Sequence, residues 1–235
     1  MQKQIRFASE KYQLYGTLHL PAEKNPPVVI GSHGLLSSGD SPKQIALAKQ
    51  CNKNNIAFFR FDHRGCGKSN GDFSSATSFK GRCRDLISAI DIMQNLPEIG
   101  SRIGLFGSSF GGAIALSVAA SFNIKPIVTV AAPMRSDTIK PPYITNPANT
   151  PMIQSLDKEK LFFDISNQVS SVSHLLIFHG DKDEIVPYSN ALKIYENAKD
   201  PKNLICQKNG DHQMSNALHQ KEFMDLAVEW YKAHF

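Results

Sequence analysis

A serine between glycines has the setting that best suits chemistry in this chain. The pentapeptide 107–111 (Gly-Ser-Ser-Phe-Gly) follows the apolar run 103–106 and opens a small apolar segment at Gly112. This order predicts a strand, a sharp turn and a helix, and glycines two residues on either side of the serine let strand and helix pack closely. Ser109 is therefore the candidate nucleophile, although such a pentapeptide alone is a weak signal.

A serine hydroxyl is a poor nucleophile, so acyl transfer at Ser109 needs a histidine base and a carboxylate that orients it. Carboxylates follow the apolar run 175–178, in a loop expected at the carboxyl edge of a sheet, where α/β active sites form. Asp183 is our choice for the orienting acid. Asp181 is its main competitor and Glu184 the third choice, because the sequence does not reveal the geometry of this turn.

A histidine follows the acid at the end of a further strand. The apolar run 204–207 is followed by the turn Asn-Gly-Asp (209–211) and then by His212. The chain has eight histidines, and any one alone is more often a surface or core residue than a catalyst. His212 completes the order Ser, Asp, His that is typical of one hydrolase architecture. We therefore predict that His212 is the general base.

The oxyanion formed in acyl transfer needs two donors that are already in place, and backbone N–H groups supply them. The amide of Phe110 is one, at a helix N-terminus where the helix dipole also favours negative charge. The amide of Leu35 is the other, in the glycine turn that follows the apolar run 28–30. We expect His33 in this turn to brace the loop through hydrogen bonds rather than to act in the chemistry.

A second loop, at 61–71, is dense in glycine and charge. Its stretch Gly-Cys-Gly-Lys-Ser (65–69) lacks the four-residue spacer of a phosphate-binding P-loop, so a structural role is favoured. We expect a network of Asp62 and Arg64 to pin this loop near the oxyanion segment.

The elements that must position these residues alternate along the chain. Short apolar runs predict buried strands at 28–30, 57–61, 103–106, 127–131, 175–178 and 204–207. Helical stretches are predicted near 42–52, 82–96, 110–120, 189–198 and 217–234. Residues 5–7 and 14–20 predict an antiparallel edge hairpin. The fold class is therefore α/β, with a mostly parallel central sheet and helices on both faces.

One segment breaks this alternation. Residues 134–173 contain four prolines and are longer than a simple repeat needs. We predict a single domain, 1–235, with a small cap inserted at 134–173; the alternative is an irregular surface excursion without a role. Five side chains of the segment are candidates to line an apolar substrate pocket or, with equal weight, to pack the cap onto the body: Tyr143, Ile144, Met152, Phe162 and Phe163.

Composition narrows the classes of function. The net charge of +5 comes from basic residues spread along the chain without a run of five, which argues against a nucleic-acid partner. The four cysteines are widely separated and form no Cys-x-x-Cys pair, so neither a zinc site nor a disulfide framework is indicated. The first residues lack an apolar leader and eighteen apolar residues nowhere run together, so we expect a cytoplasmic protein without stable membrane association.

Together these motifs resemble the α/β-hydrolase fold superfamily. The resemblance is to its small bacterial carboxylesterases and to the serine aminopeptidase-like hydrolases, which include cinnamoyl and feruloyl esterases and monoacylglycerol lipases. It covers nearly the whole chain, through residues 33–34, 61–69, 107–112, 180–187 and 210–212. It implies an α/β-hydrolase fold with a short cap after the sixth strand. It also implies a triad and two oxyanion-hole donors at these positions: Ser109, Asp183, His212, Leu35 and Phe110.

These observations predict a serine hydrolase that cleaves carboxylic esters of short or aromatic acyl groups through an acyl-enzyme, with feruloyl and cinnamoyl esters as the leading specific candidates. A thioesterase or a peptidase with the same triad is the alternative. A non-catalytic ligand-binding protein of the same fold is the rival from another class. We expect a small-molecule ester as the partner and neither a metal nor an organic cofactor; a homodimer stays open.

Overall fold

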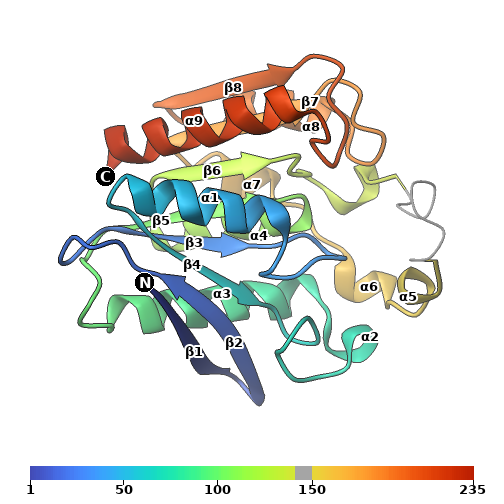
Figure 1. Ribbon diagram of the computed structural model, residues 1–235. Helices are drawn as coiled ribbons and strands as arrows, with labels where there is room; N and C mark the ends of the chain where they lie inside the picture. Colours follow the sequence, from blue (N-terminus) through green and yellow to red (C-terminus); the bar gives the residue numbers. More distant parts are fainter. Residues whose placement is uncertain (141–149) are drawn as a thin grey trace.

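An eight-stranded sheet runs through the computed structural model, which describes residues 1–140 and 150–235 (Figure 1). In chain order the strands are β1 (Gln2–Ser9), β2 (Tyr12–His19), β3 (Val28–Ser32), β4 (Ala57–Asp62), β5 (Ile103–Ser108), β6 (Ile127–Val130), β7 (Leu175–Gly180) and β8 (Lys202–Gln207). Their order across the sheet is β1-β2-β4-β3-β5-β6-β7-β8. The hairpin β1-β2 and the pair β2-β4 are antiparallel, and the remaining neighbours are parallel. The mostly parallel sheet predicted from the sequence is confirmed.

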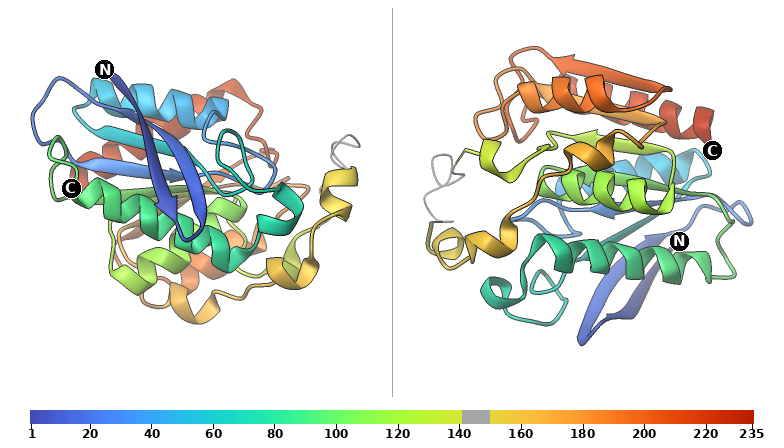
Figure 2. Two further views of the ribbon diagram at one scale, coloured as in Figure 1. Left: turned by 90° about the horizontal axis from the view of Figure 1, so that it is seen from below. Right: turned by 180° about the vertical axis from the view of Figure 1, so that it is seen from behind.

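Helices cover both faces of the sheet (Figures 1 and 2). One face carries α1 (Pro42–Lys53) and α9 (Ala217–His234), and the other carries α3 (Phe79–Gln94), α4 (Phe110–Phe122), α7 (Ser166–Val169) and α8 (Ser189–Asn197). Every residue of β3, β4, β6 and β7 is therefore buried, which explains why these strands read as continuous apolar runs. Among the described residues, no helix has the length and apolar character needed to cross a membrane.

The helix predicted at 82–96 begins three residues earlier. The hydroxyl of Ser78 accepts a hydrogen bond from the amide of Gly81 at 2.9 Å and so caps α3 ahead of Phe79. Arg82 consequently lies inside the helix instead of starting it, and its side chain is fully buried.

Between β6 and β7 the chain leaves the sheet and forms short helical elements. Before α7 these are η1 (Ser136–Thr138), α5 (Thr150–Gln154) and α6 (Lys158–Leu161). The two ends of this excursion are tied together, because Ser136 N–H donates to the carbonyl of Phe163 at 3.0 Å and Ile165 N–H donates to that of Met134 at 3.1 Å. The excursion lies where the insertion was expected. That it forms a cap stays a prediction.

Candidate active site

Ser109 occupies a strained turn between β5 and α4. Its backbone has φ +54° and ψ −124°, a conformation that costs a non-glycine residue about 1–3 kcal/mol. Close packing imposes this turn. A Cβ at Gly107 would lie 2.5 Å from the carbonyl oxygen of Gly111, and a Cβ at Gly111 would collide with the carbonyl oxygen of Ser32. The two glycines therefore let α4 start directly against the sheet and place the Ser109 hydroxyl at the end of β5.

His212 lies between Ser109 and Asp183. Its Nε2 is 3.1 Å from Oγ of Ser109, and its Nδ1 is 2.9 Å from Oδ2 of Asp183. The three residues follow β5, β7 and β8, whose carboxyl ends meet at one edge of the sheet (Figure 1). An imidazole that donates from Nδ1 to a carboxylate leaves Nε2 free to accept the serine proton. The geometry is that of a nucleophile, a base and an orienting acid.

Asp183 is held by several donors besides His212. Its Oδ1 accepts the backbone N–H groups of Ile185 at 2.9 Å and Val186 at 2.7 Å, and Nε2 of His179 lies 3.2 Å from Oδ2. Burial raises the pKa of this carboxyl, but hydrogen bonds with His179 and His212 outweigh burial and hold the pKa well below its ordinary value. Asp183 therefore stays ionised, as the orientation of a histidine base requires.

The two competitors for the acid position have other partners. Oδ1 of the exposed Asp181 accepts the N–H of Asn209 at 2.5 Å. Oε2 of Glu184 accepts the backbone N–H of His212 at 3.1 Å. In the part of the chain that the structure describes, neither carboxylate bonds to the imidazole of His212. Both instead join the loop after β7 to the loop after β8, and this fixes the approach of His212 to Asp183.

The amides of Leu35 and Phe110, which the sequence predicts as oxyanion donors, remain candidates for that role. Both residues line a cavity of about 630 Å³ that also exposes Ser109 and His212. Neither amide donates a hydrogen bond to another described residue, so both N–H groups are available to a ligand. The amide of Phe110 is the first of α4, where the helix dipole favours a negative charge.

His33 braces the turn that carries Leu35, as expected. Its Nε2 accepts the backbone N–H of His63 at 3.1 Å, so the ring proton lies on Nδ1, which donates to the carbonyl of Gly34 at 2.8 Å. Burial lowers the pKa of His33 well below its ordinary value, and the neighbouring His63 and Arg82 lower it further. The ring is therefore a neutral part of the scaffold.

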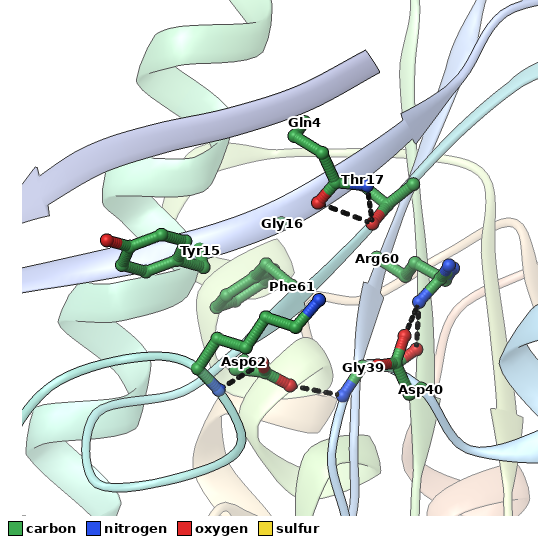
Figure 3. A pocket seen from close by; sticks show the side chains of 10 residues that line it. Gln4, Tyr15, Gly16, Thr17, Gly39, Asp40, Arg60, Phe61 and Asp62 are labelled. Atoms are coloured by element: carbon green, nitrogen blue, oxygen red, sulfur yellow. Dashed lines mark hydrogen bonds and ion pairs between the residues drawn. The ribbon is translucent and has the colours of Figure 1, made fainter. Parts of the chain in front are cut away.

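The glycine-rich loop after β4 is pinned, but not by the expected pair. Figure 3 shows Asp62 reaching the backbone of Gly39; Asp62 accepts the N–H groups of Gly39 and Lys68, both at 2.8 Å. Arg64 instead donates from Nε and Nη2 to Oδ1 of Asp85, at 2.9 and 2.8 Å. The expected Asp62–Arg64 network is wrong, because Asp62 bonds to backbone amides and Arg64 bonds to Asp85 on α3. Asp62 still ties this loop to the one that follows Leu35.

In the described part of the chain, none of the residues predicted to bind substrate lines the cavity. Tyr143 and Ile144 lie outside the described residues, and Met152 belongs to α5 with a side chain that also lies outside them. Phe162 is 67% exposed and is not among the residues that line the cavity.

Phe163 follows the packing alternative instead. Its ring is buried and stacks on Phe79 with the ring centroids 4.4 Å apart, and it meets the ring of Phe110 at 5.7 Å. This residue anchors the excursion between β6 and β7 to α3 and α4.

The cavity has lining residues that sequence reasoning missed. Lys43 reaches it from the first turn of α1, Ile139 and Ile185 contribute apolar surface, and Gln213 lies next to His212. Burial lowers the pKa of Lys43 to about 8, against the raising effect of nearby carboxylates. A signal for Lys43 was present in the sequence, because Ser-Pro before it marks a helix start soon after the turn that carries Leu35.

The sequence also matches a known protein family over more than half of its length. Residues 23–155, more than half of the 235-residue chain, match the family described as serine aminopeptidase, S33. The chain belongs to this family. It thus falls in the α/β-hydrolase superfamily, the group that the motifs resemble.

Two relatives extend the similarity beyond the family match. YfhR of Escherichia coli strain K12, an uncharacterized protein, is 32% identical over 198 residues, which are 82% of this chain and 65% of YfhR. The palmitoyl-protein thioesterase ABHD10 of Mus musculus, a mitochondrial protein, is 28% identical over 212 residues, which are 80% of this chain and 69% of ABHD10. The chain thus spans about two thirds of the length of these relatives.

A solved structure matches the fold over almost its whole length. Est1E from Butyrivibrio proteoclasticus, solved with ferulic acid bound, superimposes with a TM-score of 0.78 and 20% identity, covering 97% of this chain and 99% of Est1E. The α/β-hydrolase fold implied by the resemblance is therefore confirmed.

Proposed function

We propose that this chain is a serine hydrolase that cleaves carboxylic esters of short or aromatic acyl groups. The observation that carries the proposal is the position of His212, 3.1 Å from Oγ of Ser109 and 2.9 Å from Oδ2 of Asp183. His212 takes the Ser109 proton as Oγ attacks the ester carbonyl, and Asp183 stabilises the imidazolium that forms. The imidazolium then protonates the leaving alcohol, which gives an acyl-enzyme that water cleaves by the same steps.

The tetrahedral intermediate of each step places a negative charge on the former carbonyl oxygen. The free amides of Leu35 and Phe110 are the groups that we assign to this charge. Fixed donors of this kind each contribute roughly 10²- to 10³-fold to kcat, because they need no reorganisation when the charge develops.

The size and lining of the cavity support a short or aromatic acyl group. Its volume of about 630 Å³ is within the range of small-molecule sites, roughly 300–1,000 Å³. The polar side chains of Ser37 and Gln213 interrupt the apolar lining. A long alkyl chain laid along this cavity would bury such groups without hydrogen-bond partners, at a cost of about 1–3 kcal/mol for each group.

Thioester cleavage is the second candidate, since it uses the same groups and mouse ABHD10, a palmitoyl-protein thioesterase, is 28% identical.

Aminopeptidase activity, in which the substrate carries a free amino group, is less favoured. The described residues that line the cavity include Lys43 but no carboxylate. A substrate ammonium would therefore meet a like charge at the cavity wall.

A substrate panel tests the proposal. We would measure kcat/KM for p-nitrophenyl acetate, butyrate, octanoate and palmitate, methyl ferulate, butyryl- and palmitoyl-CoA and leucine p-nitroanilide. The proposal expects the highest values for butyrate or ferulate, a decline beyond octanoate, and background rates for the variant Ser109→Ala with an unchanged melting temperature. Faster cleavage of the CoA thioesters would favour the second candidate, and turnover that persists in Ser109→Ala would contradict the mechanism.

A further inference from the structure

Arg82 of α3 is a buried cation that the mechanism above does not use. Its side chain is fully buried, and among the described residues it forms no ion pair. A charge that is removed from water is costly unless its surroundings compensate it. Its partners are backbone carbonyls of the turn that carries Leu35: Nη1 donates to the carbonyl of Gly34 at 3.2 Å, and Nη2 donates to that of Leu35 at 3.0 Å.

The carbonyl of Gly34 and the amide of Leu35 belong to the same peptide unit. Three donors converge on this carbonyl oxygen: Nδ1 of His33 at 2.8 Å, Nη1 of Arg82 at 3.2 Å and the N–H of Ser37 at 3.3 Å. The peptide is trans, so its C=O and N–H point in opposite directions. Holding the oxygen against α3 therefore turns the N–H of Leu35 away from α3.

The same guanidinium contacts the other half of the oxyanion hole. Its Cζ lies 5.5 Å from the ring centroid of Phe110, whose amide is the second assigned donor. Nη2 also donates to Sγ of Cys66 at 3.2 Å. One buried side chain thus contacts both segments that carry the assigned donors.

We propose that Arg82 is a positioning residue of the oxyanion hole: its guanidinium fixes the Gly34–Leu35 peptide so that the Leu35 N–H faces the reacting carbonyl, and it polarises that N–H. This inference rests on the proposed ester hydrolysis. A hydrogen bond to a peptide carbonyl strengthens the N–H of the same unit as a donor. A fixed positive charge in a region of low dielectric also favours the developing oxyanion.

The proposal predicts an effect on kcat rather than on KM, because the ground-state carbonyl oxygen carries little of the charge that develops later. With p-nitrophenyl butyrate, Arg82→Met should lower kcat about 10- to 100-fold, less than the 10²- to 10³-fold for removal of a donor itself. KM should stay within about threefold. Arg82→Lys should recover part of the loss, since an ammonium can reach one of the two carbonyls.

Cys66→Ala is the matched control. It removes one contact of the guanidinium and leaves both carbonyl contacts in place. Its kcat should stay within about twofold of the wild type.

An alkyl trifluoromethyl ketone separates this role from a structural one. Its adduct with Ser109 carries an oxyanion in place of the carbonyl oxygen, so its Ki should rise across the variants by the same factor as kcat/KM falls. Rates are normalised to active sites titrated to completion with a fluorophosphonate. A structural role would lower the melting temperature or the number of titrated sites but leave kcat per site and Ki unchanged.

The outcomes are distinct. Wild-type kcat per site in Arg82→Met, or an unchanged Ki, overturns the inference while the proposed function stands. A wild-type chain that neither hydrolyses the ester nor reacts with the phosphonate overturns the proposed function, and this inference with it. If Arg82→Met does not fold, the kcat of Arg82→Lys is compared with that of Cys66→Ala. The inference predicts the lower kcat for Arg82→Lys, and equal values overturn it.

Discussion

Lowering the pH from 7 to 5 should destabilise the protein through buried histidines such as His63. His63 is fully buried, with Nε2 3.0 Å from Oγ of Ser32 and Nδ1 3.4 Å from Oδ2 of Asp85. Burial lowers the pKa of His63 from 6.5 to about 4; Asp85 opposes the shift, and Arg82 adds to it.

The sign and size of the effect follow from this depressed pKa. As the pH falls, the unfolded chain binds the proton before the folded one does, so stability is lost between pH 6.5 and about 4. One histidine with these two pKa values removes about 2 kcal/mol between pH 7 and 5. His33 and His19, whose pKa values burial also lowers, add to the loss. Asp85, with a pKa lowered by His63 and Arg64 despite burial, contributes only at more acid pH.

Urea unfolding at pH 7, 6 and 5, followed by the fluorescence of Trp230, measures this free energy. The wild type should lose at least about 2 kcal/mol between pH 7 and 5. The variant His63→Gln has one titrating group fewer and should lose about 2 kcal/mol less over the same interval. An unfolding free energy that is constant or rises as the pH falls would refute the reasoning, and so would an equal slope in the two proteins.

Further predictions concern Asp183 and Phe163. Asp183→Asn should lower kcat for p-nitrophenyl butyrate about 10³- to 10⁴-fold because the carboxylate that orients His212 and stabilises its imidazolium is lost, whereas Asp181→Asn should stay within about twofold. A loss below tenfold in Asp183→Asn would contradict its orienting role. Phe163→Ala, which removes the stack on Phe79, should cost about 3–5 kcal/mol in urea unfolding. Phe162→Ala, at 67% exposure, should cost under about 0.5 kcal/mol, and equal costs would contradict the anchoring role of Phe163.

The sequence suffices to place Ser109, Asp183 and His212 near one another, because each follows a buried strand and parallel strands end at one edge of a sheet. The choice between Asp183 and Asp181 depends on a turn. Asp183 points inward because its Oδ1 accepts two backbone amides of its own loop. No alternation of apolar and polar residues encodes that geometry.

Contacts between segments that are distant in the sequence could not be predicted from local sequence patterns. Arg64 and Asp85 are 21 residues apart, and their pairing depends on how α3 docks against the loop after β4. The prediction starts a helix at Arg82, whereas Ser78 caps α3 ahead of Phe79 and leaves Arg82 inside the helix. Its burial against the carbonyls of Gly34 and Leu35 follows only from the packing of α3 on the turn that carries Leu35.

The most direct test of the central claim is the intact mass of the protein after reaction with a fluorophosphonate. The account predicts one adduct on the wild type, one adduct on Ser108→Ala, in which the neighbouring serine is removed, and none on Ser109→Ala. An adduct that persists in Ser109→Ala, or a wild type that forms none, would contradict it.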